Sequence, residues 1–154
     1  MIQRIQTIYL LIAVLLIGAL FFVPYAVISD GMGAIYHFDA SGFYSESAPK
    51  AGLIMTSMSI VALCAISVLF IMVTIFQFKN ISRQIIFSRL NILIVIALFG
   101  LLSYNTWQCT KLITGNYSLK ISLTFPLIAI ILIYLALKAI KRDEKLLKSI
   151  NRIR

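Results

Sequence analysis

Residues 52–78 have the sequence GLIMTSMSIVALCAISVLFIMVTIFQF, an uncharged stretch between Lys50 and Lys79. A helix needs about 20 consecutive apolar residues to cross the hydrocarbon core of a bilayer, so this stretch is long enough. The rest of the chain agrees, because 61% of all residues are hydrophobic and only 12% are charged. Soluble domains average about 25% charged residues. We therefore expect lipid, rather than water, to surround most of this protein.

Three further runs have the same character. They cover residues 7–28, 90–109 and 121–137, and none contains Asp, Glu, Lys, Arg or His. The first is longer than the roughly 7–15 apolar residues of a secretory signal and lacks a small-residue cleavage pattern, so we expect it to be retained. The last is short for a span, but flanking lysines extend their amines toward the headgroups. The sequence predicts an all-α membrane protein with four transmembrane helices in a single domain, residues 1–154.

The distribution of basic residues predicts the orientation. Lys and Arg in short loops are enriched on the cytoplasmic side of a membrane. With the N-terminus inside, eleven of the fourteen Lys and Arg residues face the cytoplasm, and only Lys50, Lys111 and Lys120 lie outside. We therefore predict that both termini are cytoplasmic.

A hairpin is predicted in the first loop on the outer side. Two short aromatic runs flank Asp39-Ala40-Ser41-Gly42, a turn-forming sequence. An isolated two-stranded hairpin is marginal in water, so we expect it to rest on the helix ends or on a partner.

Residues that carry chemistry are sparse. Cys64 and Cys109 differ in depth by roughly 15 Å at 1.5 Å per helical residue, whereas a disulfide needs Cα atoms within about 7 Å. His37 is the only histidine, and no ionisable residue lies inside a predicted span. We predict no enzymatic activity, no cofactor and no metal. Clustering of His37, Asp39 and Glu46 around one outer pocket would instead favour a membrane enzyme.

Small residues mark two candidate helix-packing faces. Such residues let membrane helices approach closely, either within one chain or against a partner subunit. Both alternatives stay open from the sequence. Asn91 and Asn105 lie near opposite ends of the third run, so we expect both to reach water or headgroups. The faces consist of Gly52, Thr56 and Ser59 in the second run and Ala97, Gly100 and Ser103 in the third.

The sequence of the tail, residues 138–154, indicates a basic amphipathic helix that continues the fourth span into the cytoplasm. Its apolar stripe and positive charges suit anionic lipid headgroups at the membrane surface. Docking onto an acidic partner protein is the alternative. Asp143 and Glu144 interrupt the positive charge, which argues against nucleic acid. The basic residues are Lys138, Lys141, Arg142, Lys145, Lys148, Arg152 and Arg154.

Both ends of the chain resemble a known family. Residues 1–11, MIQRIQTIYLL, and residues 139–154, AIKRDEKLLKSINRIR, are similar to the opening and close of the bacterial family known as domain of unknown function 4293. Asn151 and Ile153 depart from that pattern, where Asp and Leu are expected. The resemblance implies a small four-helix protein of the bacterial inner membrane with no assigned activity. It also suggests that the two cytoplasmic ends touch, with Arg4 reaching Asp143 or Glu144.

These features favour a non-catalytic accessory or scaffolding subunit of a larger inner-membrane assembly, with protein-export and respiratory machineries as the candidate classes. Expected partners are the lipid bilayer and other membrane protein subunits. The alternative is a protein that binds or transports a small lipophilic ligand. A cavity lined by Thr56, Ser59, Ser103 or Tyr104 would favour that alternative, whereas tight packing with an outward small-residue face would favour the subunit.

Overall fold

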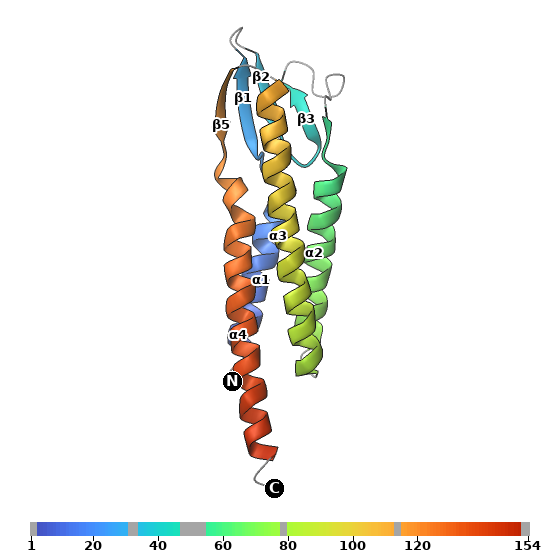
Figure 1. The fold of residues 1–154 in the computed structure, drawn as a ribbon, viewed down its shortest axis with the longest axis vertical. Coiled ribbons are helices and arrows are strands. Elements are labelled where there is room, and N and C mark those ends of the chain that lie inside the picture. The colour runs from blue at the N-terminus through green and yellow to red at the C-terminus, as the bar shows by residue number, and fades with distance from the viewer. Residues whose placement is uncertain (1–2, 31–33, 47–54, 78–79, 113–114, 152–154) are drawn as a thin grey trace.

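The computed structural model describes residues 3–30, 34–46, 55–77, 80–112 and 115–151. Four helices form a long bundle, and a small sheet covers one end of it (Figure 1). We call this the sheet end, and the opposite end, where α1 begins and α4 finishes, the termini end. The helices are α1 (Gln3–Ala19), α2 (Met58–Phe76), α3 (Ile81–Leu112) and α4 (Phe125–Asn151).

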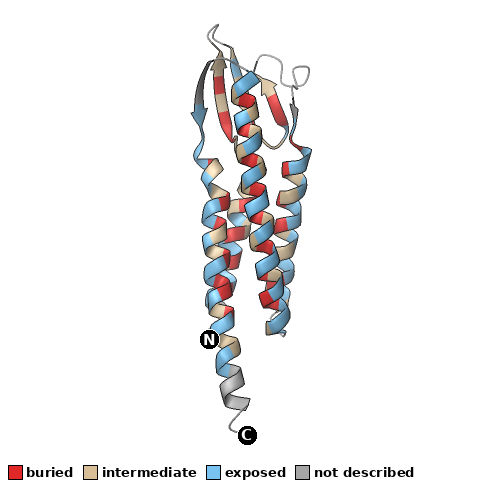
Figure 2. Ribbon diagram, in the orientation of Figure 1, coloured by how far each residue is buried: buried red, intermediate tan, exposed pale blue. Residues whose placement is uncertain are grey.

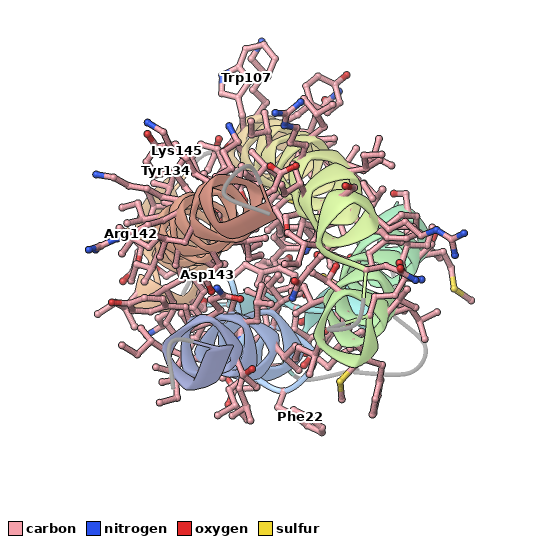
Figure 3. All side chains as sticks on the ribbon, turned by 90° about the horizontal axis from the view of Figure 1, so that it is seen from below. Phe22, Trp107, Tyr134, Arg142, Asp143 and Lys145 are labelled. Carbon is pink, nitrogen blue, oxygen red and sulfur yellow. The ribbon has the colours of Figure 1, made fainter. Side chains whose placement is uncertain are left out.

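The helices form a closed ring in which each one packs against two neighbours. α1 contacts α2 and α4, and α3 contacts the same two helices (Figure 3). Each helix contributes a fully buried residue to the centre, namely Ile17, Ile71, Leu98 and Ile133. The outward faces are also apolar, although they are exposed (Figure 2). Helices that are hydrophobic all round belong inside a large protein or in a membrane.

Three of the described helical segments are long and apolar enough to cross a membrane. They are Met58–Phe76, Ile81–Leu112 and Ile121–Leu146. The apolar part of α1, Ile5–Ala19, is shorter. The four apolar runs of the sequence thus become four helices, as predicted, with the first shorter than expected.

The prediction of a helix over residues 7–28 is wrong for residues 20–28. α1 ends at Ala19, and Ala26–Asp30 form strand β1. Pro24 explains the change, because it has no N–H to donate and disfavours helical backbone in the residue before it. After Pro24, the Tyr25 hydroxyl donates a hydrogen bond of 2.8 Å to the Leu20 carbonyl, one of the carbonyl groups that lack a helical partner at the end of α1.

The sheet is larger than the predicted hairpin. Strands β2 (Ile35–Phe38) and β3 (Gly42–Ser45) form that hairpin, with Phe38 opposite Phe43. Three more strands extend it into one antiparallel sheet of order β4-β3-β2-β1-β5. The additional strands are β1, β4 (Met55–Thr56) and β5 (Gly115–Leu119). β5 comes from the second loop and pairs with β1, so the sheet joins segments from both loops and needs no partner to hold the hairpin.

The other helices also differ in length from their predicted bounds. α2 begins at Met58 rather than at residue 52, because β4 precedes it. α3 begins at Ile81 instead of residue 90, since no Gly or Pro interrupts its first turns. A short 3-10 helix, η1 (Ile121–Thr124), leads into α4. α4 then runs without a break to Asn151, which confirms that the fourth helix continues into the tail.

Candidate functional site

The two ends of the chain meet through a polar contact at the termini end. The Gln6 side chain donates a hydrogen bond from Nε2 to Oδ2 of Asp143. Gln6 is only 4% exposed, and among the described residues the buried Oδ1 of Asp143 has no hydrogen-bond partner. The two ends of the chain therefore do contact each other at Asp143, as the family resemblance suggests, and the contacting residue of α1 is Gln6. The side chain of Arg4 lies outside the described part of the structure.

A small enclosed pocket lies beside this contact. Its volume of about 20 Å³ is about the space that one water molecule needs. Gln84 closes it from α3, and its Nε2 donates 3.2 Å to the Thr74 carbonyl of α2. The pocket thus sits where all four helices meet, and it is too small for an organic ligand. Its lining consists of Gln6, Thr7, Ile75, Ile81, Gln84, Ile140 and Asp143.

A much larger open groove lies on the outer surface between α1 and α4, near the same end. Its volume is about 570 Å³. The lining includes the first four basic residues of the predicted tail set, all of them exposed, so the structure brings these residues together. Lys148 belongs to α4, but its side chain lies outside the described part, as do residues 152 and 154. The lining residues are Ile5, Tyr9, Leu135, Lys138, Ala139, Lys141, Arg142 and Lys145.

The two predicted small-residue faces have different outcomes. Thr56 belongs to strand β4, opposite Gly42, while Ser59 is exposed in the first turn of α2. The predicted helical face of residues 52, 56 and 59 is therefore wrong in its geometry, and residue 52 itself lies outside the described part.

The face on α3 does form, and it points outward. Ala97 and Gly100 are exposed, and no atom of the described structure lies within 4 Å of a Cβ built at Gly100. Ser103 is half-buried and borders a shallow groove of about 320 Å³ at the sheet end, next to Thr106 and Trp107. This face is not used to pack the bundle.

A buried polar pair between α2 and α3 was not predicted. Asn91 is 1% exposed, and its Oδ1 accepts a hydrogen bond of 2.9 Å from the Ser67 hydroxyl. The expectation that Asn91 reaches water is therefore wrong. A sequence signal existed, because Gln84, Ser88 and Asn91 continue the same spacing of three and four residues as the buried apolar residues further along α3.

Polar side chains also meet on the sheet. His37 Nε2 lies 3.6 Å from Oε2 of Glu46, and the two side chains are 28% and 61% exposed. The Tyr44 ring stacks on His37 and its hydroxyl donates 2.8 Å to Oδ2 of Asp39. That hydrogen bond, together with partial burial, raises the pKa of Tyr44 above its ordinary value. These groups do cluster, but on the surface of the β2–β3 hairpin, and their contacts hold that hairpin together.

The cysteines lie apart in the core. Cys64 in α2 and Cys109 in α3 are both free and buried. Within the described ranges, no group of three His, Cys, Asp or Glu side chains is arranged to hold a metal ion.

The comparisons with known proteins give one result. None of the curated proteins matches this chain. Residues 2–153 match the family described as Domain of unknown function (DUF4293), which is almost the full length of the sequence. The match spans both the two similar ends and the apolar helices between them. The chain therefore belongs to the DUF4293 family.

Proposed function

We propose that this protein is a non-catalytic accessory or scaffolding subunit of a larger assembly in the bacterial inner membrane, with both termini in the cytoplasm. Protein-export and respiratory machineries are the candidate classes of assembly. The subunit contributes a helix face to its partners within the membrane, and its basic residues at the termini end lie at the cytoplasmic membrane surface.

The orientation is supported by charge and by aromatic residues. Arg83 and Arg89 are exposed on the first turns of α3, at the same end as the basic residues of α4. At the sheet end, exposed Trp107 carries the Lys111 amine 3.7 Å above its ring centre. Aromatic residues concentrate where membrane meets water, and Lys and Arg concentrate on the cytoplasmic side. Both distributions support a cytoplasmic position of the termini end.

The observation that carries the subunit proposal is the outward small-residue face on α3. Ala97 and Gly100 are exposed in a helix that is long enough to cross the membrane. Against lipid, such a face gains little contact, whereas a second helix can approach it closely and pack backbone to backbone. The neighbouring exposed residues Leu93 and Tyr104 are large enough to flank a helix seated there.

Transport or binding of a small lipophilic ligand inside the bundle is less well supported. The enclosed pocket between the helices has room for about one water. Thr56 and Ser59 are exposed, and Ser103 borders an open groove on the outside of α3 and η1. The polar residues that would line an internal ligand cavity do not converge in the described structure.

Affinity purification of the tagged protein from native membranes in a mild detergent, followed by mass spectrometry, tests the subunit proposal. We expect stoichiometric recovery of larger membrane proteins with the wild type. The double variant Ala97→Leu/Gly100→Leu should lose them, because leucine side chains would keep a partner helix at a distance.

The matched control is Ala62→Leu/Ala65→Leu, which adds the same side chains to the exposed face of α2. This control should keep the partners. Recovery of the wild type only as a free monomer or homo-oligomer would refute the proposal. Equal recovery with both double variants would show that the α3 face is not the interface.

A further inference from the structure

The groove between α1 and α4 is amphipathic in a regular way. Ile5 and Tyr9 of α1 and Leu135 and Ala139 of α4 give it an apolar floor. The basic side chains of α4 line the same groove and recur at spacings of three and four residues, which places them on one side of the helix. The groove therefore joins a hydrocarbon-like surface to a concentrated positive charge.

The two carboxylates in this part of α4 do not line the groove. Asp143 points into the bundle, where it is hydrogen-bonded to Gln6 (Figure 3). Arg142 and Lys145 point away from the bundle in the same view. Glu144 is half-buried and lies more than a quarter turn of helix away from the line through Lys138 and Lys145. The Gln6 contact thus turns one negative charge away and leaves the groove electropositive.

The depth of the groove matches the boundary between hydrocarbon and headgroups. The apolar part of α4 ends at Leu137, and Lys138 is its first charged residue. From Leu135 to Lys145 the helix rises about 15 Å, so Leu135, with Tyr9 one turn deeper than Ile5 on α1, lies beside acyl chains. The basic residues lie among headgroups, as does Ile5, which the Gln6 contact places level with Asp143. The volume of about 570 Å³ falls within the range of roughly 300–1,000 Å³ typical of small-molecule sites.

We propose that this groove binds one anionic phospholipid of the cytoplasmic leaflet, with its phosphate among Lys138, Arg142 and Lys145 and an acyl chain along Tyr9, Ala139 and Leu135. Arg and Lys bind phosphate oxygens through charge-assisted hydrogen bonds, and Arg does so with two parallel ones. An acidic segment of a protein would also match the charge, but it would not use the apolar floor. The inference rests on the membrane orientation proposed above and does not require a partner subunit.

The test uses the full chain, purified in mild detergent and freed of native lipid. Native mass spectrometry counts the lipids bound per chain as dioleoylphosphatidylglycerol or dioleoylphosphatidylcholine is added. We expect one phosphatidylglycerol to bind before any phosphatidylcholine does. Lys138→Gln/Arg142→Gln should weaken that binding about thirtyfold, because each Lys or Arg near anionic lipid contributes about 1 kcal/mol of binding free energy.

Two further variants separate the groove from general surface charge. Arg83→Gln/Arg89→Gln removes the same charge from exposed positions on α3 at the same end, and it should leave phosphatidylglycerol binding unchanged. Ala139→Trp fills the floor without changing any charge, and it should reduce binding strongly. Circular dichroism confirms that each variant keeps its helical content.

Three outcomes would overturn the proposal. The first is equal binding of the two lipids, and the second is equal weakening by the two charge-removing variants. The third is that Ala139→Trp binds phosphatidylglycerol as tightly as the wild type does. That result would mean that charge alone holds the occupant, as it would hold an acidic protein segment. The groove variants should still co-purify with partner proteins, because the proposed partner interface is the small-residue face of α3 and not the groove. Failure of the lipid site and failure of the subunit proposal are therefore distinguishable.

Discussion

The contact between Gln6 and Asp143 makes a quantitative prediction about how the two ends of the chain stabilise the bundle. Gln6→Leu keeps nearly the same volume but removes the donor to a carboxylate whose other oxygen already lacks a partner among the described residues. A hydrogen bond to a charged group contributes about 1.5–3 kcal/mol. Asp143 is half-buried, so water can replace part of the loss. We expect Gln6→Leu to lower the free energy of unfolding by about 1.5–2 kcal/mol.

The assay is reversible unfolding in mixed detergent micelles, followed by circular dichroism, for the single and double variants of Gln6 and Asp143. Replacing both partners with leucine removes the unpaired charge, so the double variant should cost less than the sum of the single ones. Gln108→Leu is the control, since its hydrogen bond to Tyr104 is exposed, and it should cost less than about 0.5 kcal/mol. Additivity of the Gln6 and Asp143 effects within about 0.5 kcal/mol would refute the reasoning.

Three other predictions follow from the core and the sheet. Ser67→Ala removes the buried hydrogen bond to Asn91. It should lower the free energy of unfolding in the same assay by about 0.6 kcal/mol and by no more than about 1.7 kcal/mol, the average and the maximum for such bonds between membrane helices. Gly42→Ala should cost about 1–3 kcal/mol, because Gly42 has a φ of 142° that side chains disfavour; an unchanged midpoint would contradict this strain. Tyr44 should titrate above its ordinary pKa, because its hydrogen bond to Asp39 favours the neutral phenol. That bond should therefore stabilise the fold fully at pH values below the ordinary tyrosine pKa, and the stabilisation should be lost as the pH rises through the raised pKa of Tyr44. Asp39→Asn should lower the pKa of Tyr44. The pKa is measured from phenolate absorbance against pH, after subtraction of the curve for Tyr44→Phe, and an unchanged pKa would exclude Asp39 as the cause of the shift.

Local patterns in the chain account for the helices. Each uncharged run gives a helix, because a long apolar segment in lipid satisfies its backbone groups only by hydrogen-bonding within itself. α4 continues to Asn151 because no Gly or Pro interrupts residues 127–151. The β2–β3 hairpin follows from the turn at Asp39–Gly42, whose aspartate accepts hydrogen bonds from the backbone N–H groups of Ser41 and Gly42.

The end of α1 illustrates where such patterns are insufficient. Residues 26–28 are as apolar as the helix before them, and their strand exists because β5, about ninety residues later in the chain, pairs with it. Pro24 signals a break, but it does not indicate which distant segment receives the hydrogen bonds. A sheet assembled from two separate loops depends on both being brought to the same end of the bundle.

The basic residues of the tail were identified from the sequence, whereas the groove they line was not. Spacing along α4 places Lys138, Arg142 and Lys145 on one face. Only the packing of α1 beside that face supplies Ile5 and Tyr9 and turns a charged helix surface into a bounded site. The same packing brings Gln6 to Asp143, across 137 positions of sequence.

The sequence by itself therefore determined that the chain forms four apolar helices, that the last extends into a basic tail, and that its two ends carry the family pattern. The tertiary structure alone decided which helix faces are buried, where α1 stops, and which polar groups meet. The physical reason is that the exposed faces of these helices consist of the same apolar residue types as the faces buried in the core. Only the contacts between helices distinguish the buried Leu98 from the exposed Leu93 on α3.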